Sequence, residues 1–379
     1  MAGTLDRAAR YVPRHLVSSA ALGRARSVAL QLPAALTNWI YLECRLAGST
    51  CPDCGPDSAF DESSRVDLIV RVDERGRSRL TGDADGRALG EPLVSTPIWT
   101  RIRSLARAWA GAHAGLQRAI GRLWLEFDID ATTVDSAAPP VPRVFVEFAP
   151  ELYCSRSVAL RTEAIVAAME LLTGERMRPS TARTVRRCVE QLPPGACIPF
   201  AGTLQPSAAA ATRICVTGLR TSNVAAYLHA IGWSGETDAL STVLGSAAGG
   251  ALPAAPVGVL NVDAGADVAP RMGVEHLLDR RSQLGGRILE DDLLDALVAR
   301  GMCTSHKRAA LPEWCGWSRE IMPHELWSSL VVRRVNHLKI TTSGSGRAEA
   351  KAYLCLTHAF HGAPRAHADP LHTTEGSIQ

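Results

Sequence analysis

The chain has 379 residues, of which 46% are hydrophobic and 5% aromatic, with 41 Lys and Arg against 38 Asp and Glu. This hydrophobic fraction is typical of a globular protein and excludes a chain that is disordered throughout. The net charge of +3 lacks the concentrated basic excess that usually marks nucleic-acid-binding proteins, so no nucleic-acid partner is expected.

Neither export nor membrane attachment is predicted. The first 26 residues carry five arginines without an uninterrupted apolar core, unlike a signal peptide. The apolar stretch 27–42 is interrupted by Gln31, Pro33 and Asn38 and falls short of the roughly 20 apolar residues of a membrane helix. The ten cysteines are scattered, which does not suggest a small secreted disulfide scaffold. We therefore expect a cytoplasmic protein.

The amino-terminal third predicts helices and one hairpin. A helix is expected over 15–47, with a kink or a break at Pro33, which lacks a backbone N–H. The β-branched run 66–72 predicts a strand, and turn residues after it suggest a hairpin with a short strand at 77–80. Helical spacing of apolar residues returns over 96–121.

Strand pairs and helices alternate along the rest of the chain. The clearest pair is 123–129 with 143–148, in which apolar and polar residues alternate. The remaining predicted elements, in chain order, are helices 156–173 and 180–192, strands 197–204 and 211–218, helices 221–232 and 237–246, strands 256–263 and 269–276, helices 290–301, 306–311 and 322–330, and strands 333–342 and 349–358.

Five hairpins separated by helices favour an α/β (α+β) protein with a ten-stranded antiparallel β-barrel built from five helix–hairpin repeats and helices outside. Closure removes the edge strands. An ordinary α+β sheet with one solvated face produces the same alternation and stays open as an alternative. One domain is expected over 1–360, followed by a disordered tail over 361–379.

The two faces of the predicted strands differ in character. The apolar face is suited to packing under helices: Leu123, Leu125, Phe127, Val144, Val146, Phe148, Ile214, Val216, Met272, Val274, Leu338, Ile340, Ala352, Leu354 and Leu356. The opposite face carries polar, charged and aromatic residues: Trp124, Glu126, Asp128, Arg143, Phe145, Glu147, Arg213, Cys215, Thr217, Asn261, Asp263, Arg271, Glu275, His337, Lys339, Thr341, Lys351, Tyr353 and Cys355. In a barrel this second face points inward.

This pattern resembles the prenyltransferase barrel of the aromatic (ABBA, indole-type) prenyltransferases over roughly residues 15–358. Lys351-Ala352-Tyr353 is similar to the Lys-x-Tyr strand signature of the indole prenyltransferases. Glu126 lies where that family tends to place an acidic residue that binds the acceptor. The resemblance implies an allylic diphosphate donor, an aromatic or peptide acceptor and inward basic residues that hold the diphosphate.

Convergent basic side chains suit a diphosphate, because guanidinium groups bind it through two hydrogen bonds and an ammonium group supplies a compact charge. The candidates, from different strands, are Arg143, Arg213, Arg271, Lys339 and Lys351. Salt bridges to the acidic residues of the same face are the structural alternative. Only three of the 41 basic residues are lysines, and two of these share the final hairpin and the polar face, whereas Lys307 lies in a helical connection. The excess of arginine itself suggests GC-rich bacterial coding.

The acidic residues offer acid–base or metal chemistry. Glu126 and Asp128 point the same way from one strand, and Glu126 is the candidate that orients or deprotonates the acceptor. Glu126 and Asp128, together with Asp263, are also suited to Mg²⁺ bound with a diphosphate. Glu275 and His276 form a second acid–base candidate. No DDxxD-like cluster is present, and no dedicated metal site or required cofactor is expected.

Cysteines and a histidine provide further candidate site residues. Cys44, Cys51 and Cys54 have zinc-like spacing without a fourth ligand nearby, so incidental thiols in a loop are the alternative. His337 shares the polar face of the strands with Glu275, and both are assigned to substrate binding.

The sequence therefore predicts a prenyltransferase in a bacterial natural-product pathway, acting on an aromatic small molecule or modifying a peptide side chain. Tyr353 and Trp124 flank the carbocation in this hypothesis. The family shields that cation with several strand tyrosines, whereas Tyr353 is the one tyrosine on a predicted strand with inward parity. Two alternatives stay open: a non-catalytic or accessory barrel that binds a peptide or apolar ligand, and another transferase that uses a phosphorylated substrate.

Overall fold

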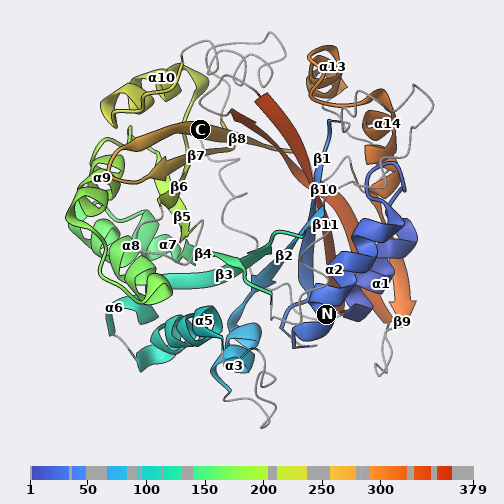
Figure 1. Ribbon diagram of the computed structural model, residues 1–379, viewed down its shortest axis with the longest axis horizontal. Coiled ribbons are helices and arrows are strands. Elements are labelled where there is room, and N and C mark those ends of the chain that lie inside the picture. Colours follow the sequence, from blue (N-terminus) through green and yellow to red (C-terminus); the bar gives the residue numbers. More distant parts are fainter. Residues whose placement is uncertain are drawn as a thin grey trace, which may run out of the picture.

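The computed structural model describes residues 2–33, 36–47, 66–82, 93, 96–112, 114–129, 140–203, 211–236, 257–278, 283, 291–321, 328–342 and 348–360. Ten strands of these segments close into an antiparallel barrel, and helices surround the ring (Figure 1). The barrel strands are β1 (Trp39–Arg45), β2 (Val66–Val72), β3 (Ile120–Phe127), β4 (Arg143–Phe148), β5 (Cys197–Thr203), β6 (Thr212–Thr217), β7 (Val259–Ala264), β8 (Val268–Leu277), β10 (Ser328–Thr342) and β11 (Ala348–Phe360).

The ring closes because β11 pairs with both β10 and β1. Every other barrel strand pairs with its two neighbours in the chain, except that β8 pairs with β10 and not with β9 (Gly316–Ile321). The predicted ten-stranded barrel is thereby confirmed, and the open sheet with one solvated face is excluded. The strand β9 is attached to the outer part of β10, beyond the ring.

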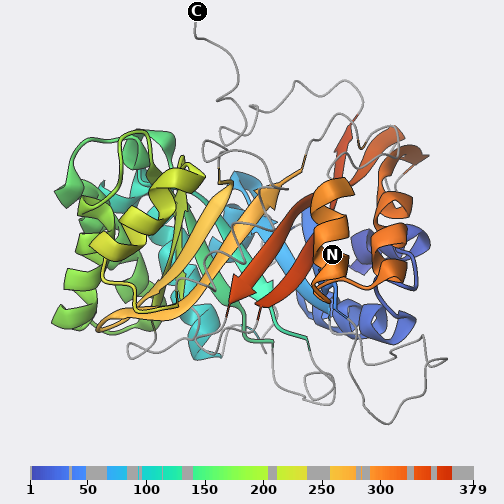
Figure 2. The same ribbon diagram turned by 90° about the horizontal axis from the view of Figure 1, so that it is seen from above.

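Helices cover the outside of the barrel on several sides. They are α1 (Ala2–Tyr11), α2 (Ser19–Gln31), α3 (Glu74–Thr81), α5 (Pro97–Arg107), the π-helix η1 (Ala108–Ala112), α6 (Ala114–Gln117), α7 (Pro150–Tyr153), α8 (Val158–Thr173), α9 (Pro179–Glu190), α10 (Thr221–Ala230), α13 (Asp291–Ala299) and α14 (Ser305–Trp314). Figure 2 shows helices of residues 150–230 on one side of the strands and helices from the two ends of the chain on the other. No helix in the described segments has the length and apolar character needed to cross a membrane.

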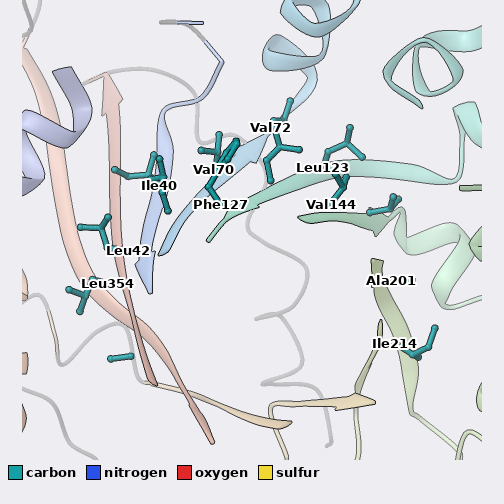
Figure 3. Close-up of a cluster of buried hydrophobic side chains, with 14 of the residues drawn as sticks. Ile40, Leu42, Val70, Val72, Leu123, Phe127, Val144, Ala201, Ile214 and Leu354 are labelled. Atoms are coloured by element: carbon teal, nitrogen blue, oxygen red, sulfur yellow. The ribbon is translucent and has the colours of Figure 1, made fainter. Parts of the chain in front are cut away.

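The hydrophobic core lies between the barrel and these helices. Every residue of the predicted apolar face is buried and belongs to one cluster with helix residues such as Trp99, Leu172 and Trp314. Figure 3 shows side chains of this cluster on consecutive strands, from Ile40 on β1 to Ile214 on β6. Since burial of each large apolar side chain contributes about 1.5–3 kcal/mol, this layer is the main source of the barrel's stability.

The predicted helix 15–47 is wrong in its second half. Helix α2 ends at Gln31, two residues before Pro33, and β1 begins at Trp39. The segment 39–45 alternates, with Ile40, Leu42 and Cys44 in the outer core, which is the period of a strand. The first hairpin is therefore β1 with β2.

The predicted strand 77–80 is also wrong, because these residues belong to α3. The carboxylate of Asp73 accepts hydrogen bonds from the backbone N–H groups of Arg75 and Gly76, which starts the helix. Gly82, with φ 83°, ends it in the left-handed conformation. These capping interactions prevail over the turn-like composition of the segment.

Two further boundaries differ from prediction. The helix expected over 96–121 gives way to β3 at Ile120, and residues 328–330 of the helix expected over 322–330 belong to β10. The expected helix 237–246 and the tail 361–379 lie outside the described residues. The other predicted strands and the helices 156–173 and 180–192 are found within a few residues of their expected bounds.

Candidate active site

The register of the barrel places the second set of side chains on its inner face. Residues that lie opposite each other on paired strands point to the same side. Glu43 lies opposite Tyr353 and Asp67, Glu126 opposite Arg143, and Arg213 opposite Asp263. On the last strands Lys339 lies opposite both Glu275 and Lys351. The predicted polar face is therefore one continuous inner surface.

A small aromatic cluster lies on this inner surface, apart from the outer core. Tyr41, Ile69, Tyr353 and Cys355 are buried together, with Trp39 and Trp124 against them. The ring centroids of Tyr41 and Trp124 lie 5.5 Å apart, and the rings of Trp124 and Phe200 form a T-shaped contact with centroids 6.3 Å apart. The aromatic residues thus come from β1, β3, β5 and β11 and include the predicted Trp124 and Tyr353.

Sequence reasoning missed Trp39, Tyr41 and Glu43 because it placed all of β1 inside a helix. The signal was present, since the aromatic residues Trp39 and Tyr41 alternate with the aliphatic residues Ile40 and Leu42. With Tyr41 and Trp39 added, the inner surface is richer in aromatic rings than the count of strand tyrosines suggested.

Lys339 is the centre of one inner hydrogen-bonded network. Its Nζ lies 3.0 Å from Oε1 of Glu275 and 3.3 Å from Oδ1 of Asn261, and Asn261 donates to Glu275 at 3.0 Å. Burial alone raises the pKa of Glu275, but the charge of Lys339 and the hydrogen bonds from Lys339 and Asn261 outweigh it and lower that pKa to about 2. Glu275 is therefore a stable carboxylate.

His337 joins this network to the aromatic cluster. Its ring stacks on Tyr353 with centroids 3.9 Å apart, and its Nε2 lies 3.7 Å from Oε2 of Glu275. Burial lowers the pKa of His337 to about 4, and that of His276 also to about 4. Both imidazoles are neutral at pH 7.

Lys351 forms a second network with Glu43 of β1. The two side chains form a direct ion pair, and the Tyr353 hydroxyl donates a hydrogen bond to the same carboxylate. Burial raises the pKa of Glu43, yet the charge and hydrogen bond of Lys351 reverse the effect and lower it to about 2. Burial lowers the pKa of Lys351, and the charge of Glu43 more than offsets it, so the ammonium stays charged.

Glu126 is the acidic residue best suited to exchange a proton. Arg143 donates to its Oε1 at 3.2 Å and also forms an ion pair with Asp128. Burial first and the charge of Glu43 second raise the pKa of Glu126 to about 7, against the opposing charges of Arg143, Lys339 and Arg213. Near neutral pH this carboxyl group is therefore present in both protonation states.

Arg213 is buried in a two-hydrogen-bond pair with Asp263, at 2.7 and 3.0 Å. Burial opposes its charge, but Asp263 raises the pKa of the guanidinium above its ordinary value. Arg271, in contrast, is exposed near the beginning of β8. The structure thus brings together the inner residues Glu126, Arg143, Arg213, Lys339 and Lys351 and leaves Arg271 at the periphery.

The third lysine, Lys307, connects a helix to the barrel. Lys307 on α14 donates to the backbone oxygen of Arg45 at 2.8 Å and so ties the helix to the end of β1. It is not an incidental residue of a helical connection, although it lies outside the inner surface.

The metal candidates lead to no site in the described part of the chain. No three or more His, Cys, Asp or Glu side chains there come together as metal ligands. Cys44 is buried, which raises the pKa of its thiol to about 12, and Cys51 and Cys54 lie outside the described residues. Glu126 and Asp128 are bound to Arg143, and Asp263 to Arg213, so this donor set does not fit Mg²⁺.

Comparisons with known proteins bear on the fold. No family model and no curated protein matches the sequence. Among solved structures, a 6-dimethylallyl tryptophan synthase matches with a TM-score of 0.50 and 12% identity, over 94% of this chain and 95% of that chain. The apo form of the prenyltransferase PriB matches with a TM-score of 0.48 and 14% identity over 94% of both chains. AnaPT from Neosartorya fischeri matches with a TM-score of 0.43 and 11% identity, over 87% of this chain and 80% of that chain.

At this identity the likeness concerns the architecture. The fold, a closed barrel of ten antiparallel strands surrounded by helices, matches that of the 6-dimethylallyl tryptophan synthase over nearly the whole length of both chains. The chain therefore has the prenyltransferase-barrel fold of the ABBA proteins.

Proposed function

We propose that the protein transfers an isoprenoid from an allylic diphosphate to an aromatic acceptor, either a small molecule or a side chain of a peptide. One observation carries the proposal: the inner surface combines aromatic rings, buried cations and a carboxyl group that titrates near neutral pH. A bacterial, cytoplasmic natural-product pathway is the setting we infer for it.

In the proposed reaction the basic residues bind the diphosphate and stabilise it as a leaving group. Arg143, Arg213, Lys339 and Lys351 lie on the inner surface, and Arg271 would act only from the periphery. The C–O bond of the donor breaks, its electron pair leaves with the diphosphate, and the cationic side chains stabilise that developing charge. Low water content inside the barrel would strengthen these interactions.

The aromatic residues and Glu126 act on the other two partners. The faces of Trp124, Tyr353 and Tyr41 stabilise the allylic cation through their negative quadrupoles. The aromatic acceptor forms the new bond to carbon with a ring electron pair and then loses a proton to the Glu126 carboxylate. Asp128, Glu275 and His337 orient the acceptor and the basic groups.

The reaction requires no cofactor in this proposal. Since the carboxylates are bound to arginine and lysine, a Mg²⁺ ion would be held mainly by the diphosphate itself, and no step depends on it. The requirement for Mg²⁺ is decided by running the assay below with and without the ion.

One observation favours a non-catalytic alternative. The buried inner cations Arg213, Lys339 and Lys351 each have a carboxylate partner. A diphosphate has to displace or share these carboxylates, whereas a neutral peptide or apolar ligand does not. A binding or accessory protein for such a ligand is therefore the second candidate, and a transferase for another phosphorylated substrate stays a third.

Donor binding separates these functions. The protein is incubated with dimethylallyl, geranyl and farnesyl diphosphate, with and without Mg²⁺, and binding and pyrophosphate release are measured. We expect binding of at least one donor and faster release when tryptophan or a tryptophan-containing peptide is added. If none of the three donors binds, the prenyltransferase proposal is wrong; binding without release under all these conditions favours the accessory protein.

A further inference from the structure

The strand β9 lies outside the closed barrel. The long strand β10 pairs with two strands along one of its edges. Its residues Ser328–Arg333 pair with β9, and His337–Thr342 pair with β8. The other edge of β10 is taken by β11. β9 consequently has one strand neighbour in the described structure, and Figure 1 shows it at the rim of the molecule.

Helix α1 fixes β9 in place on one face. Glu320 forms an ion pair with Arg7 at 3.2 Å and accepts a hydrogen bond from Tyr11 at 3.0 Å. Arg333 of β10 donates to Ser318 at 3.2 Å and stacks over the Tyr11 ring at 3.7 Å. An edge that is already ordered loses little conformational entropy when a further strand pairs with it.

The other face of β9 carries large apolar side chains in solvent. Trp317 is 56% exposed and Ile321 is 76% exposed, with Arg319 between them on the same face. Natural proteins usually protect such edges with proline, lysine or a covering segment, and β9 has neither proline nor lysine. These features point to an edge that is covered by a partner strand.

The sequence of β9 is complementary to itself in one antiparallel register. When two copies meet about a two-fold axis at Ser318, Trp317 of one lies beside Arg319 of the partner subunit, and the reverse pair forms by symmetry. A guanidinium over an indole contributes about 0.5–1 kcal/mol at an exposed site. A register centred on Arg319 instead places two like charges opposite each other, which is unfavourable. On the α1 face, the chosen register puts Gly316 beside the partner's Glu320.

We propose that β9 is an association edge through which two copies of this chain form a symmetric dimer with one sheet continuous across both. The occupant of the edge is a second β9, selected by the Trp317–Arg319 pairing. The proposal concerns a surface outside the barrel interior and does not depend on the proposed catalysis.

Sedimentation analysis of the full chain over about a hundredfold range of concentration tests the dimer. The decisive variants are Trp317→Glu and Trp317→Arg, since both remove the indole. In the proposed register Trp317→Glu faces Arg319 of the partner subunit and retains association, whereas Trp317→Arg faces a like charge. We expect the dimer of Trp317→Arg to be at least about tenfold weaker than that of Trp317→Glu, a difference of about 1.4 kcal/mol.

Two further variants complete the test. The double variant Trp317→Arg with Arg319→Glu restores the opposite charges and should recover the dimer. Leu160→Arg changes a side chain of matched exposure (55%) on α8 and should leave association unchanged. Because these side chains are in solvent, melting temperatures compared at a concentration where every variant is monomeric should stay near that of the natural chain, which separates association from folding.

The proposal is overturned if the natural chain stays monomeric throughout the range, or if the Glu and Arg variants of Trp317 are weakened equally. Open-ended polymers would also contradict it, since an isologous edge pairing closes at two copies.

Discussion

Lys339 links two parts of the inner surface, because its ammonium group contacts Glu275 and Asn261 on neighbouring strands. Its stem passes close to Gly273, whose absent side chain leaves room: an added Cβ would lie 3.3 Å from Lys339 Cε. The sequence singled out this lysine by its rarity among arginines. The Asn261 and Glu275 contacts give that choice a physical basis, since they hold the charge at a defined place.

Replacing Lys339 with alanine should weaken binding of an allylic diphosphate by more than about tenfold, because one compact charge is lost from the proposed anion site. Titration calorimetry with dimethylallyl diphosphate measures the change. Arg271→Ala is the matched control, since Arg271 is exposed, and should change affinity by less than about threefold. Equal losses in both variants would show that the lysine has no special part in binding.

Glu126 should make the activity and the stability depend on pH in opposite directions. Its pKa in the folded protein is raised to about 7, whereas an unfolded glutamate titrates near 4.3. Between these values the folded state binds more protons than the unfolded state, so the contribution of this group to stability falls as pH rises. The carboxylate, the form that accepts a proton, is gained over the same range.

The variant Glu126→Gln tests both effects. Its melting temperature relative to the natural chain should increase from pH 5 to pH 8, because the buried charge is absent. The transfer rate of the natural chain should rise with pH through about 7, and this rise should be missing in the variant. A pH–rate profile unchanged by the substitution would remove Glu126 from the proton transfer.

Among the elements, β1 shows what a sequence can and cannot predict about this barrel. The strand β4, which alternates strictly, was found at its predicted bounds, since one face packs under helices and the other is polar. β1 alternates too, but five of its seven residues are buried, including Tyr41 and Glu43 of the inner face. Whether this segment forms a strand depends on β11, which pairs with it from more than 300 residues away. The local sequence of β1 carries no information about that partner.

The pairing of charged residues also depends on strands that are far apart in the sequence. The sequence predicted which face Glu126, Arg213 and Lys339 share, because parity follows from spacing. Salt bridges to acidic residues of the same face were the alternative left open for the basic residues, and the pairs Arg213–Asp263 and Lys339–Glu275 are found. Which acidic residue pairs with which basic residue was not predicted, since that choice depends on the register between distant strands. Sequence reasoning also missed Glu43, which influences the pKa values of both Glu126 and Tyr353.

Helix α3 approaches the segment before β1 so closely that it requires glycine at position 76. A Cβ on Gly76 would lie 2.2 Å from the backbone oxygen of Leu36 and 2.8 Å from Cγ1 of Val72. Gly76→Ala should therefore destabilise the protein by about 1–3 kcal/mol through overpacking, seen as a lower midpoint in urea unfolding. Gly23→Ala is the matched control: it lies in α2 with no atom within 4 Å of the new Cβ, and should be neutral or slightly stabilising. If both variants unfold at the same urea concentration, the close approach of α3 is not required.

For the whole molecule, the inner ion pairs join the strands that close the ring. Lys351 and Glu43 connect β11 to β1, and Lys339 and Glu275 connect β10 to β8. The pKa values of Glu43 and Glu275 are lowered to about 2, below the unfolded value near 4.3. Their contribution to stability is therefore complete above about pH 4.3 and is lost as pH falls toward 2.

We expect the free energy of unfolding, measured in urea, to fall steeply between about pH 4.5 and pH 2.5, because protonation weakens closure at two places at once. Glu275→Gln should flatten this dependence. At pH 7 the same variant should be less stable by about 3–5 kcal/mol, since Lys339 stays buried without its carboxylate. Glu190→Gln removes the exposed partner of Arg186 and should change stability by less than about 0.5 kcal/mol. An acid limb as steep in Glu275→Gln as in the natural chain would mean that closure does not depend on the Lys339–Glu275 pair.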